Sequence, residues 1–282
     1  MIEAILCIIC NVLILFAFRQ IGKRNIPRLP ALIVNYLAAF TTGILFFFED
    51  LSKVEAMDWW WPVGLGLGFI LVFNLMAALT HRIGMGPGSM IIKLSVVIPS
   101  VTAIFFYGES PGTWMALGIV IALASLFLTS DTRKGKISMG WLALGVFFGA
   151  GSLDALLNHL HYDVADENAY GIFSTLIFLF AALWGGFLAT VRGTIGTIKR
   201  SSVWMWGIIL GIPNFGSVYF LLLALNRSDI PSSGMFPFIN VSIVLLSTFV
   251  GWILFGERTN TQKAMGILLG IISLVLIAYG GS

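Results

Sequence analysis

Two ionisable residues lie inside stretches that are otherwise apolar, Lys93 in SMIIKLSVVI and Asp154 in GAGSLDALLN. A charged side chain within an apolar helix costs several kcal/mol unless it faces a cavity or a partner, so both residues are functional candidates. A lysine ammonium can bind a carboxylate or another anionic group, and a desolvated carboxylate can take up and release a proton. The two residues therefore indicate binding and proton exchange.

Lys93 belongs to a polar stripe, because Ser89 and Ser100 lie four residues before it and seven after it on the same helix face. A second stripe, with Asn240 at its centre, occurs 147 residues later. We expect both stripes to face one cavity, with Lys93 as the docking charge for an anionic group. The alternative is a lysine that snorkels to the membrane interface from a position near the start of its helix.

Three roles are open for Asp154: a proton-coupling carboxylate, a counter-ion of Lys93, and simple lining of a cavity. The predicted helix ends place Asp154 and Lys93 in opposite halves of the bilayer, roughly 10–15 Å apart at 1.5 Å per residue. A direct salt bridge therefore requires those helix ends to shift.

A further set of polar side chains lies within the apolar stretches, where lipid would leave them without hydrogen bonds. For each, substrate binding competes with a hydrogen bond between helices. Asn214 follows Pro213, which should kink its helix and free backbone carbonyls toward a cavity. The members are Asn11, Asn35, Asn74, Asn214 and Tyr219.

The elements that position these residues are membrane helices. The chain has 282 residues, 58% hydrophobic and 10% charged, with a mean hydropathy of +0.97. A soluble domain has roughly 25% charged residues, so only a bilayer suits this composition. We predict an all-α membrane protein with ten transmembrane helices, at Ile2–Phe18, Pro30–Phe48, Pro62–Thr80, Gly88–Tyr107, Gly112–Thr129, Met139–Asn158, Ala169–Val191, Val203–Leu225, Ser232–Phe255 and Asn260–Tyr279.

Basic residues in the connecting loops predict the orientation. Ten spans place both termini on one side of the membrane. The loops on the opposite side contain thirteen lysines and arginines, whereas the loops on the terminal side contain two, Lys53 and Arg227. Because basic loops stay in the cytoplasm, we expect both termini on the non-cytoplasmic side.

An internal repeat divides the chain into five-helix halves, residues 1–135 and 136–282. Residues 107–130 align without gaps on residues 255–278, with nine of 24 positions identical. Glu109 and Glu257 occupy equivalent positions, each just before a helix whose first turn a carboxylate could cap. Because each half contains an odd number of spans, the second half should be inverted relative to the first.

The motifs Tyr107-Gly108-Glu109 and Phe255-Gly256-Glu257 end the fourth and ninth predicted spans, and each is followed by a helix with spaced glycines. This pattern resembles the drug/metabolite transporter superfamily, EamA type. The resemblance implies two inverted five-helix repeats and a cavity lined by spans one to four and six to nine. It also implies a functional acid on the first helix of a repeat, as in small four-helix members, and Asp154 lies on the first helix of the second half. The resemblance implies an N-terminus on the cytoplasmic side, as in many members, whereas the loop charges of this chain favour the reverse orientation.

These features predict a secondary transporter of the cytoplasmic (inner) membrane, multi-pass, that moves a small organic solute by alternating access. Lys93 and Asp154 together would suit a zwitterion such as an amino acid, and proton coupling is one of the modes left open. A lipid-head-group flippase is an alternative, and a membrane-embedded enzyme is a weaker one, because common catalytic motifs are absent. We expect no cofactor, no metal and no nucleic acid, and a monomer or weak dimer.

Overall fold

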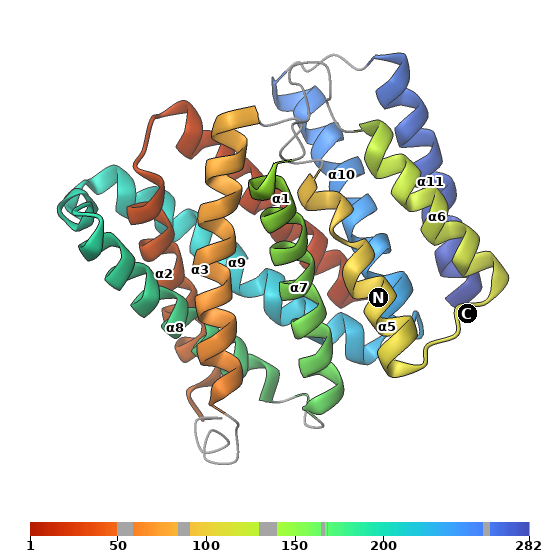
Figure 1. Ribbon diagram of the computed structural model, residues 1–282, viewed down its shortest axis with the longest axis horizontal. Helices are drawn as coiled ribbons and strands as arrows, with labels where there is room; N and C mark the ends of the chain where they lie inside the picture. Colours follow the sequence, from red (N-terminus) through yellow and green to blue (C-terminus); the bar gives the residue numbers. More distant parts are fainter. Residues whose placement is uncertain are drawn as a thin grey trace. The chain divides into compact units, whose positions relative to one another are not determined.

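A computed structural model describes residues 1–49, 59–83, 91–129, 140–164, 167, 169–255 and 260–281. Within these ranges the chain is helical and contains no strand (Figure 1). The elements are α1 (Ile2–Lys23), α2 (Arg28–Phe47), α3 (Trp60–Ile83), α5 (Val97–Tyr107), α6 (Thr113–Thr129), α7 (Trp141–Asp163), α8 (Ala169–Val191), the short 3-10 helix η2 (Ile195–Lys199), α9 (Ser201–Arg227), α10 (Ser232–Phe255) and α11 (Thr261–Gly281).

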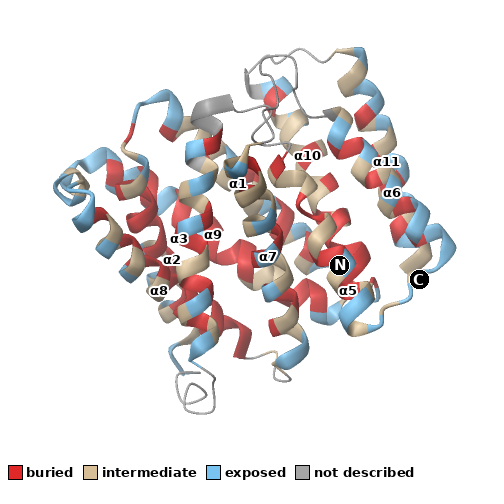
Figure 2. Ribbon diagram, viewed as in Figure 1, coloured by how far each residue is buried: buried red, intermediate tan, exposed pale blue. Residues whose placement is uncertain are grey.

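Seven of these helices are long and apolar enough to cross a membrane: α1, α2 and α7 to α11. Three shorter apolar helices, Trp60–Met76, Ile91–Tyr107 and Thr113–Leu128, occupy the remaining predicted stretches. Large apolar side chains on the helix surfaces are exposed, as lipid contact requires, with Phe105 and Phe106 each 79% exposed. Figure 2 shows exposed residues recurring along α6, α8 and α11. The chain has the character of a multi-pass membrane protein.

Contacts group the chain into two compact units. The first, here the α2–α8 unit, comprises Ile2–Leu71 and Tyr162–Leu223. The second, here the α6–α11 unit, comprises Val72–His161 and Ala224–Ser282 together with Met1. Each unit takes segments from both predicted halves of the sequence, 1–135 and 136–282.

In the α6–α11 unit, α6 and α11 pack side by side and antiparallel (Figure 1). Ser125 Oγ on α6 donates to Gly266 O on α11 at 2.7 Å. Gly118, seven residues earlier on α6, contacts Ile277, eleven residues later on α11. A methyl group added at Gly118 would lie 2.8 Å from Ile277 Cγ1, so only a glycine permits this approach. Small residues bring the two backbones close enough for van der Waals packing to hold them together in lipid.

In the α2–α8 unit, α2 and α8 form the corresponding antiparallel pair. Gly43 on α2 packs against Thr175, whereas Ile33, ten residues earlier, packs against Gly185, ten residues later on α8. The inner faces of both helices are fully buried, and Tyr36 stacks on Phe178 with ring centroids 6.0 Å apart. This pair forms the core of its unit.

Three predicted spans need the largest corrections. α1 continues to Lys23 instead of ending at Phe18. α7 continues to Asp163 instead of ending at Asn158, so His159 and His161 lie on the helix. The predicted span Gly88–Tyr107 is interrupted by a turn at Ser95 and Val96, after which α5 begins at Val97.

Candidate functional site

The interrupted helix in the α6–α11 unit marks the candidate site. Residues 91–94 are helical, and α5 restarts the helix after the turn. The amide of Ile98 donates to Ser95 O at 2.9 Å, one residue closer in sequence than the α-helical acceptor Leu94 O. Pro99, four residues after Ser95, has no N–H to donate. The carbonyls of Leu94 and Ser95 therefore each retain hydrogen-bonding capacity that a continuous helix would use.

Lys93 lies in the last turn before this break, where its side chain is half-buried. Ser100, on the other side of the break, is buried, and its hydroxyl donates to Val96 O at 3.1 Å within its own helix. Ser89, the third member of the predicted polar stripe, lies outside the described residues. The break thus separates Lys93 from Ser100 and disturbs the regular stripe that the sequence predicts.

α7 runs parallel to the interrupted helix and packs against the break. Ile91 shares an apolar cluster with Val146, and at the far end Tyr107 Oη and His159 Nδ1 are 2.5 Å apart. Between these contacts, a methyl group added at Gly151 would lie 2.7 Å from Ser95 O. The missing side chain at Gly151 therefore lets the α7 backbone lie directly against the turn.

Asp154 is half-buried one turn beyond Gly151, on the same face of α7. Lys93 lies two residues before Ser95, so roughly 8 Å separates Lys93 from Asp154 along the parallel axes at 1.5 Å per residue. No ion pair joins the two side chains within the part of the chain that the structure describes. The charges flank the break without neutralising each other directly.

Asn158 is a polar residue that the sequence reasoning did not single out. It is 0% exposed, and neither Oδ1 nor Nδ2 has a hydrogen-bond partner among the described residues. It lies four residues after Asp154, so the two side chains project from one face of α7. The i, i+4 spacing of Asp154 and Asn158 was the available signal in the sequence. It was missed because the predicted helix ended at Asn158.

Two other predicted site residues belong to the same unit. Asn240 is half-buried on α10, and its Nδ2 donates to Phe236 O at 3.0 Å within that helix. Asn74 is half-buried on α3, in the segment where Val72 packs against Gly149 of α7. Both residues belong to the α6–α11 unit.

The α2–α8 unit holds a second polar group, in which the structure brings together two predicted candidates. Asn214 Nδ2 on α9 donates to Asn35 Oδ1 on α2 at 3.1 Å, and the residues are 5% and 0% exposed. The helices approach closely here because Gly211 offers no side chain against Asn35 O. The pair forms the interhelical hydrogen bond that the sequence offered as the alternative to substrate binding.

Tyr219 and Asn11 complete the candidates of this unit. The Tyr219 ring stacks on Phe215 at 16°, and its centroid is 4.9 Å from that of Phe47. Asn11 Nδ2 donates to Cys7 O at 2.9 Å, within α1. Tyr219 is therefore part of an aromatic cluster, and the Asn11 amide bonds to its own helix.

Glu109 contacts a different helix from the one expected. Its carboxylate accepts hydrogen bonds from Ser232 N at 2.9 Å, Ser232 Oγ at 2.6 Å and Ser233 N at 2.8 Å. These groups form the first turn of α10, where free N–H groups and the helix dipole favour a negative charge. Glu109 thus caps a helix that begins 123 residues later in the sequence. Glu257 lies outside the described residues.

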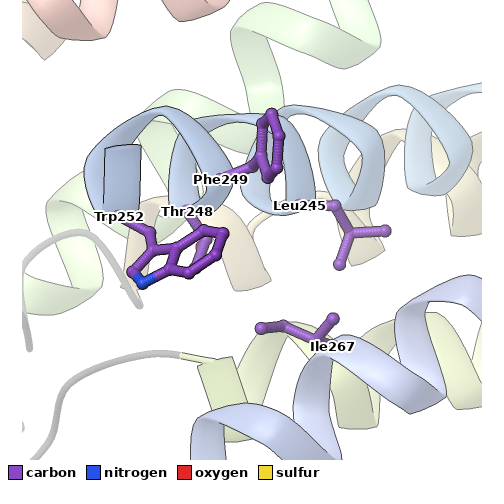
Figure 3. A pocket seen from close by; sticks show the side chains of 5 residues that line it. All are labelled: Leu245, Thr248, Phe249, Trp252 and Ile267. Atoms are coloured by element: carbon purple, nitrogen blue, oxygen red, sulfur yellow. The ribbon is translucent and has the colours of Figure 1, made fainter. Parts of the chain in front are cut away.

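An apolar pocket of about 300 Å³ lies between α10 and α11 (Figure 3). Phe249 and Trp252 on α10 are 53% and 60% exposed, so the pocket opens onto the outer surface of its unit. It contains no charged side chain and is lined by Leu245, Thr248, Phe249, Trp252 and Ile267. Such a surface suits hydrocarbon rather than a polar solute.

Comparison with known proteins gives a coarse classification. No protein-family model matches the chain. Over 98% of its length it is 25% identical to an uncharacterized protein of Haemophilus influenzae, of which 97% is covered. An alignment that covers 56% of the chain shows 28% identity to the MFS-type efflux transporter ffsH of Aspergillus flavipes and covers 28% of that protein.

Among solved structures, the crystal structure of a protein that is 14% identical to the chain matches with a TM-score of 0.73. The match covers 98% of this chain and 94% of the other. The fold is therefore shared with a solved structure over nearly the whole length. The protein is a helical, membrane-type protein with weak sequence similarity to a transporter.

Proposed function

We propose that the protein is a secondary transporter of ten spans, arranged as two inverted five-helix repeats, that moves a small organic solute by alternating access. The observation that carries this proposal is the antiparallel packing of α2 with α8 and of α6 with α11. Counted along the ten apolar helices, the members of each pair are five helices apart. Equivalent helices of an inverted repeat must run antiparallel, and inverted repeats are a transporter architecture.

The contact of Glu109 with α10 supports the same arrangement. Glu109 follows the end of the fourth apolar helix, and its partners begin the ninth. The fourth helix therefore ends where its counterpart starts, as an inverted pair does. Similarity to an efflux transporter supports the assignment as a transporter. The Gly-Glu pairs at 108–109 and 256–257 support the drug/metabolite transporter type.

We place the solute site at the helix break in the α6–α11 unit. Interrupted helices in transporters expose backbone groups to a cavity at the middle of the membrane, and charged residues in that position mark the transport pathway. Lys93 would bind the anionic group of the solute, and Asp154 would bind its cationic group or the coupling ion. The two residues are offset by roughly 8 Å along the helix axes, which is comparable with the length of a small zwitterion.

The deciding experiment is uptake of radiolabelled amino acids by proteoliposomes that contain the purified protein. We expect saturable uptake by the native protein and loss of uptake in Lys93→Gln, with equal protein inserted. Lys199→Gln is the matched control, because Lys199 is an exposed lysine on η2 in the other unit. Equal uptake by Lys93→Gln and the native protein would contradict the role of Lys93.

A lipid-head-group flippase is the second candidate, and the apolar pocket between α10 and α11 favours it. The same proteoliposomes separate the two functions when they carry fluorescent phospholipids. Phospholipid movement without solute uptake would replace the transporter proposal by the flippase.

The orientation with both termini outside the cytoplasm follows from the loop charges alone. A reporter enzyme that is active only outside the cytoplasm, fused to the C-terminus, should be active. Activity of a reporter that works only in the cytoplasm would reverse the orientation.

A further inference from the structure

We propose that the pocket between α10 and α11 binds one acyl chain of an anionic phospholipid, with the phosphate of the head group beside Lys263. The pocket and the lysine both belong to the α6–α11 unit. The proposal goes beyond the transport of a solute, because the lipid would be a resident ligand of the outer surface and not the transported molecule.

The shape of the pocket suits a hydrocarbon chain. Its lining extends from Leu245 to Trp252 on α10, roughly 10 Å at 1.5 Å per residue. Ile267 on α11 forms the opposite wall (Figure 3). One leaflet of a bilayer contains roughly 15 Å of hydrocarbon, so the pocket can hold most of the length of one acyl chain.

The pocket opens toward the bilayer. Both α10 and α11 are long and apolar enough to cross a membrane. Phe249 and Trp252 are each more than half exposed, and exposed apolar side chains on such helices face lipid. Trp252 lies three residues before the end of α10, where a tryptophan ring suits the boundary between hydrocarbon and head groups. An acyl chain is therefore the molecule in contact with the mouth of the pocket.

A lysine lies on the side of the pocket nearest the start of α11. Lys263 is half-buried and comes four residues before Ile267, so the two side chains share one face of the helix. Asn260 Oδ1 accepts a hydrogen bond from the Lys263 backbone amide at 2.8 Å, which fixes this first turn. Helical side chains lean toward the N-terminus, so the ammonium reaches from the apolar lining toward the head groups. A phosphate there would meet the ammonium and the positive end of the helix dipole.

The surrounding charge favours an anionic head group over a zwitterionic one. The charge of Lys263 acts on Lys93 in the same unit, and like charges repel each other strongly where water does not screen them. A phosphate beside Lys263 would offset this repulsion. The loop charges predict that α11 begins on the cytoplasmic side, where basic pockets between membrane helices bind anionic head groups.

The test is the melting temperature of the protein, purified in detergent, with added dioleoylphosphatidylglycerol or dioleoylphosphatidylcholine. The two lipids have the same acyl chains, so they isolate the charge of the head group. We expect a saturable rise of several degrees with the phosphatidylglycerol and a smaller rise with the phosphatidylcholine, because a ligand that binds only the folded state stabilises it. No rise with either lipid would overturn the site, and equal rises would overturn the preference for an anionic head group.

One variant tests the contact with the head group. Lys263→Gln should bind the phosphatidylglycerol about fivefold more weakly and respond to the phosphatidylcholine as the native protein does. Lys199→Gln is the matched control, because Lys199 is an exposed lysine on η2 in the other unit. Equal affinities of Lys263→Gln and the native protein for the phosphatidylglycerol would overturn the role of Lys263.

A second variant tests the contact with the acyl chain. Ile267→Trp fills the pocket and should abolish the melting response to both lipids. Ile272→Trp is the control, because Ile272 is 40% exposed on the same helix and does not line the pocket. Native mass spectrometry should retain one phosphatidylglycerol on the native protein and on Ile272→Trp, and none on Ile267→Trp. A lipid retained equally by Ile267→Trp would remove the pocket from the site.

The lipid site and the transport function fail separately. The melting and mass-spectrometry measurements use no solute, so their failure leaves the transporter proposal in place. Fluorescent phosphatidylglycerol that crosses the membrane of proteoliposomes with the native protein, but not with Lys263→Gln, would overturn the assignment as a resident lipid and make it a transported one.

Discussion

The two units differ in how they hold a buried asparagine. In the α2–α8 unit, one hydrogen bond joins Asn214 to Asn35 across two helices, and Asn35 Nδ2 has no partner among the described residues. In the α6–α11 unit, Asn158 is just as deeply buried, and neither of its polar atoms has a partner among the described residues. The hydrogen bond between helices stabilises the interface in the first unit, whereas the Asn158 amide makes no such contribution in the second.

The largest effect is expected when the carboxylate of Asp154, four residues before Asn158 on α7, is neutralised. Asp154→Asn removes the charge that would bind the coupling ion while keeping the side-chain volume. Gradient-driven accumulation of solute should fall about tenfold or more, because a charge-assisted contact contributes roughly 1.5–3 kcal/mol. Exchange of external for internal solute should persist, and accumulation equal to that of the native protein would remove Asp154 from coupling.

Truncation of the paired asparagine should act on stability instead. Asn214→Ala leaves Asn35 buried without its partner, and the free energy of unfolding should fall by roughly 1–3 kcal/mol. Thermal unfolding in detergent would measure the loss, and uptake per folded molecule should be unchanged. The double replacement Asn35→Leu with Asn214→Leu should regain part of the stability, since it removes both partners. A loss of uptake larger than the loss of folded protein would turn this pair into a functional site.

The smallest effect is expected at the cap that joins the fourth and ninth apolar helices. Glu109→Gln keeps a hydrogen-bonding side chain but removes the negative charge from the first turn of α10. The protein should lose about 1 kcal/mol of stability, the usual contribution of a charge at a helix N-terminus. Equal melting temperatures for Glu109→Gln and the native protein would show that the charge adds nothing to the cap.

Helix positions were largely predictable from the sequence, since apolar runs bounded by turn residues define membrane spans. α8 and α10 begin and end at the predicted residues Ala169, Val191, Ser232 and Phe255. The break at Ser95 was missed because a run of apolar residues looks the same whether its helix is continuous or interrupted. Pro99 was the available signal, because it cannot donate to the carbonyl four residues back.

The contacts of the site depend on residues that are distant in sequence, and this limited their prediction. The sequence singled out Lys93 and Asp154 as the ionisable residues of the apolar stretches, yet nothing in the spacing revealed the contact that Gly151 makes between their helices. The partner of Glu109 lies 123 residues away, so local reasoning assigned the cap to the neighbouring helix. The Asn35–Asn214 pair likewise spans 179 residues, and only packing decides which of several buried amides find each other.

Gly151 gives the experimenter a means of forcing the two helices apart. A Cβ atom at this position would overlap Ile98 Cδ1 and lie 2.7 Å from Ser95 O, so α7 and the turn are in direct contact. Alanine at Gly151 would act as a wedge of one methyl group at this junction. The variant therefore reports whether the protein needs the two helices to touch at the break.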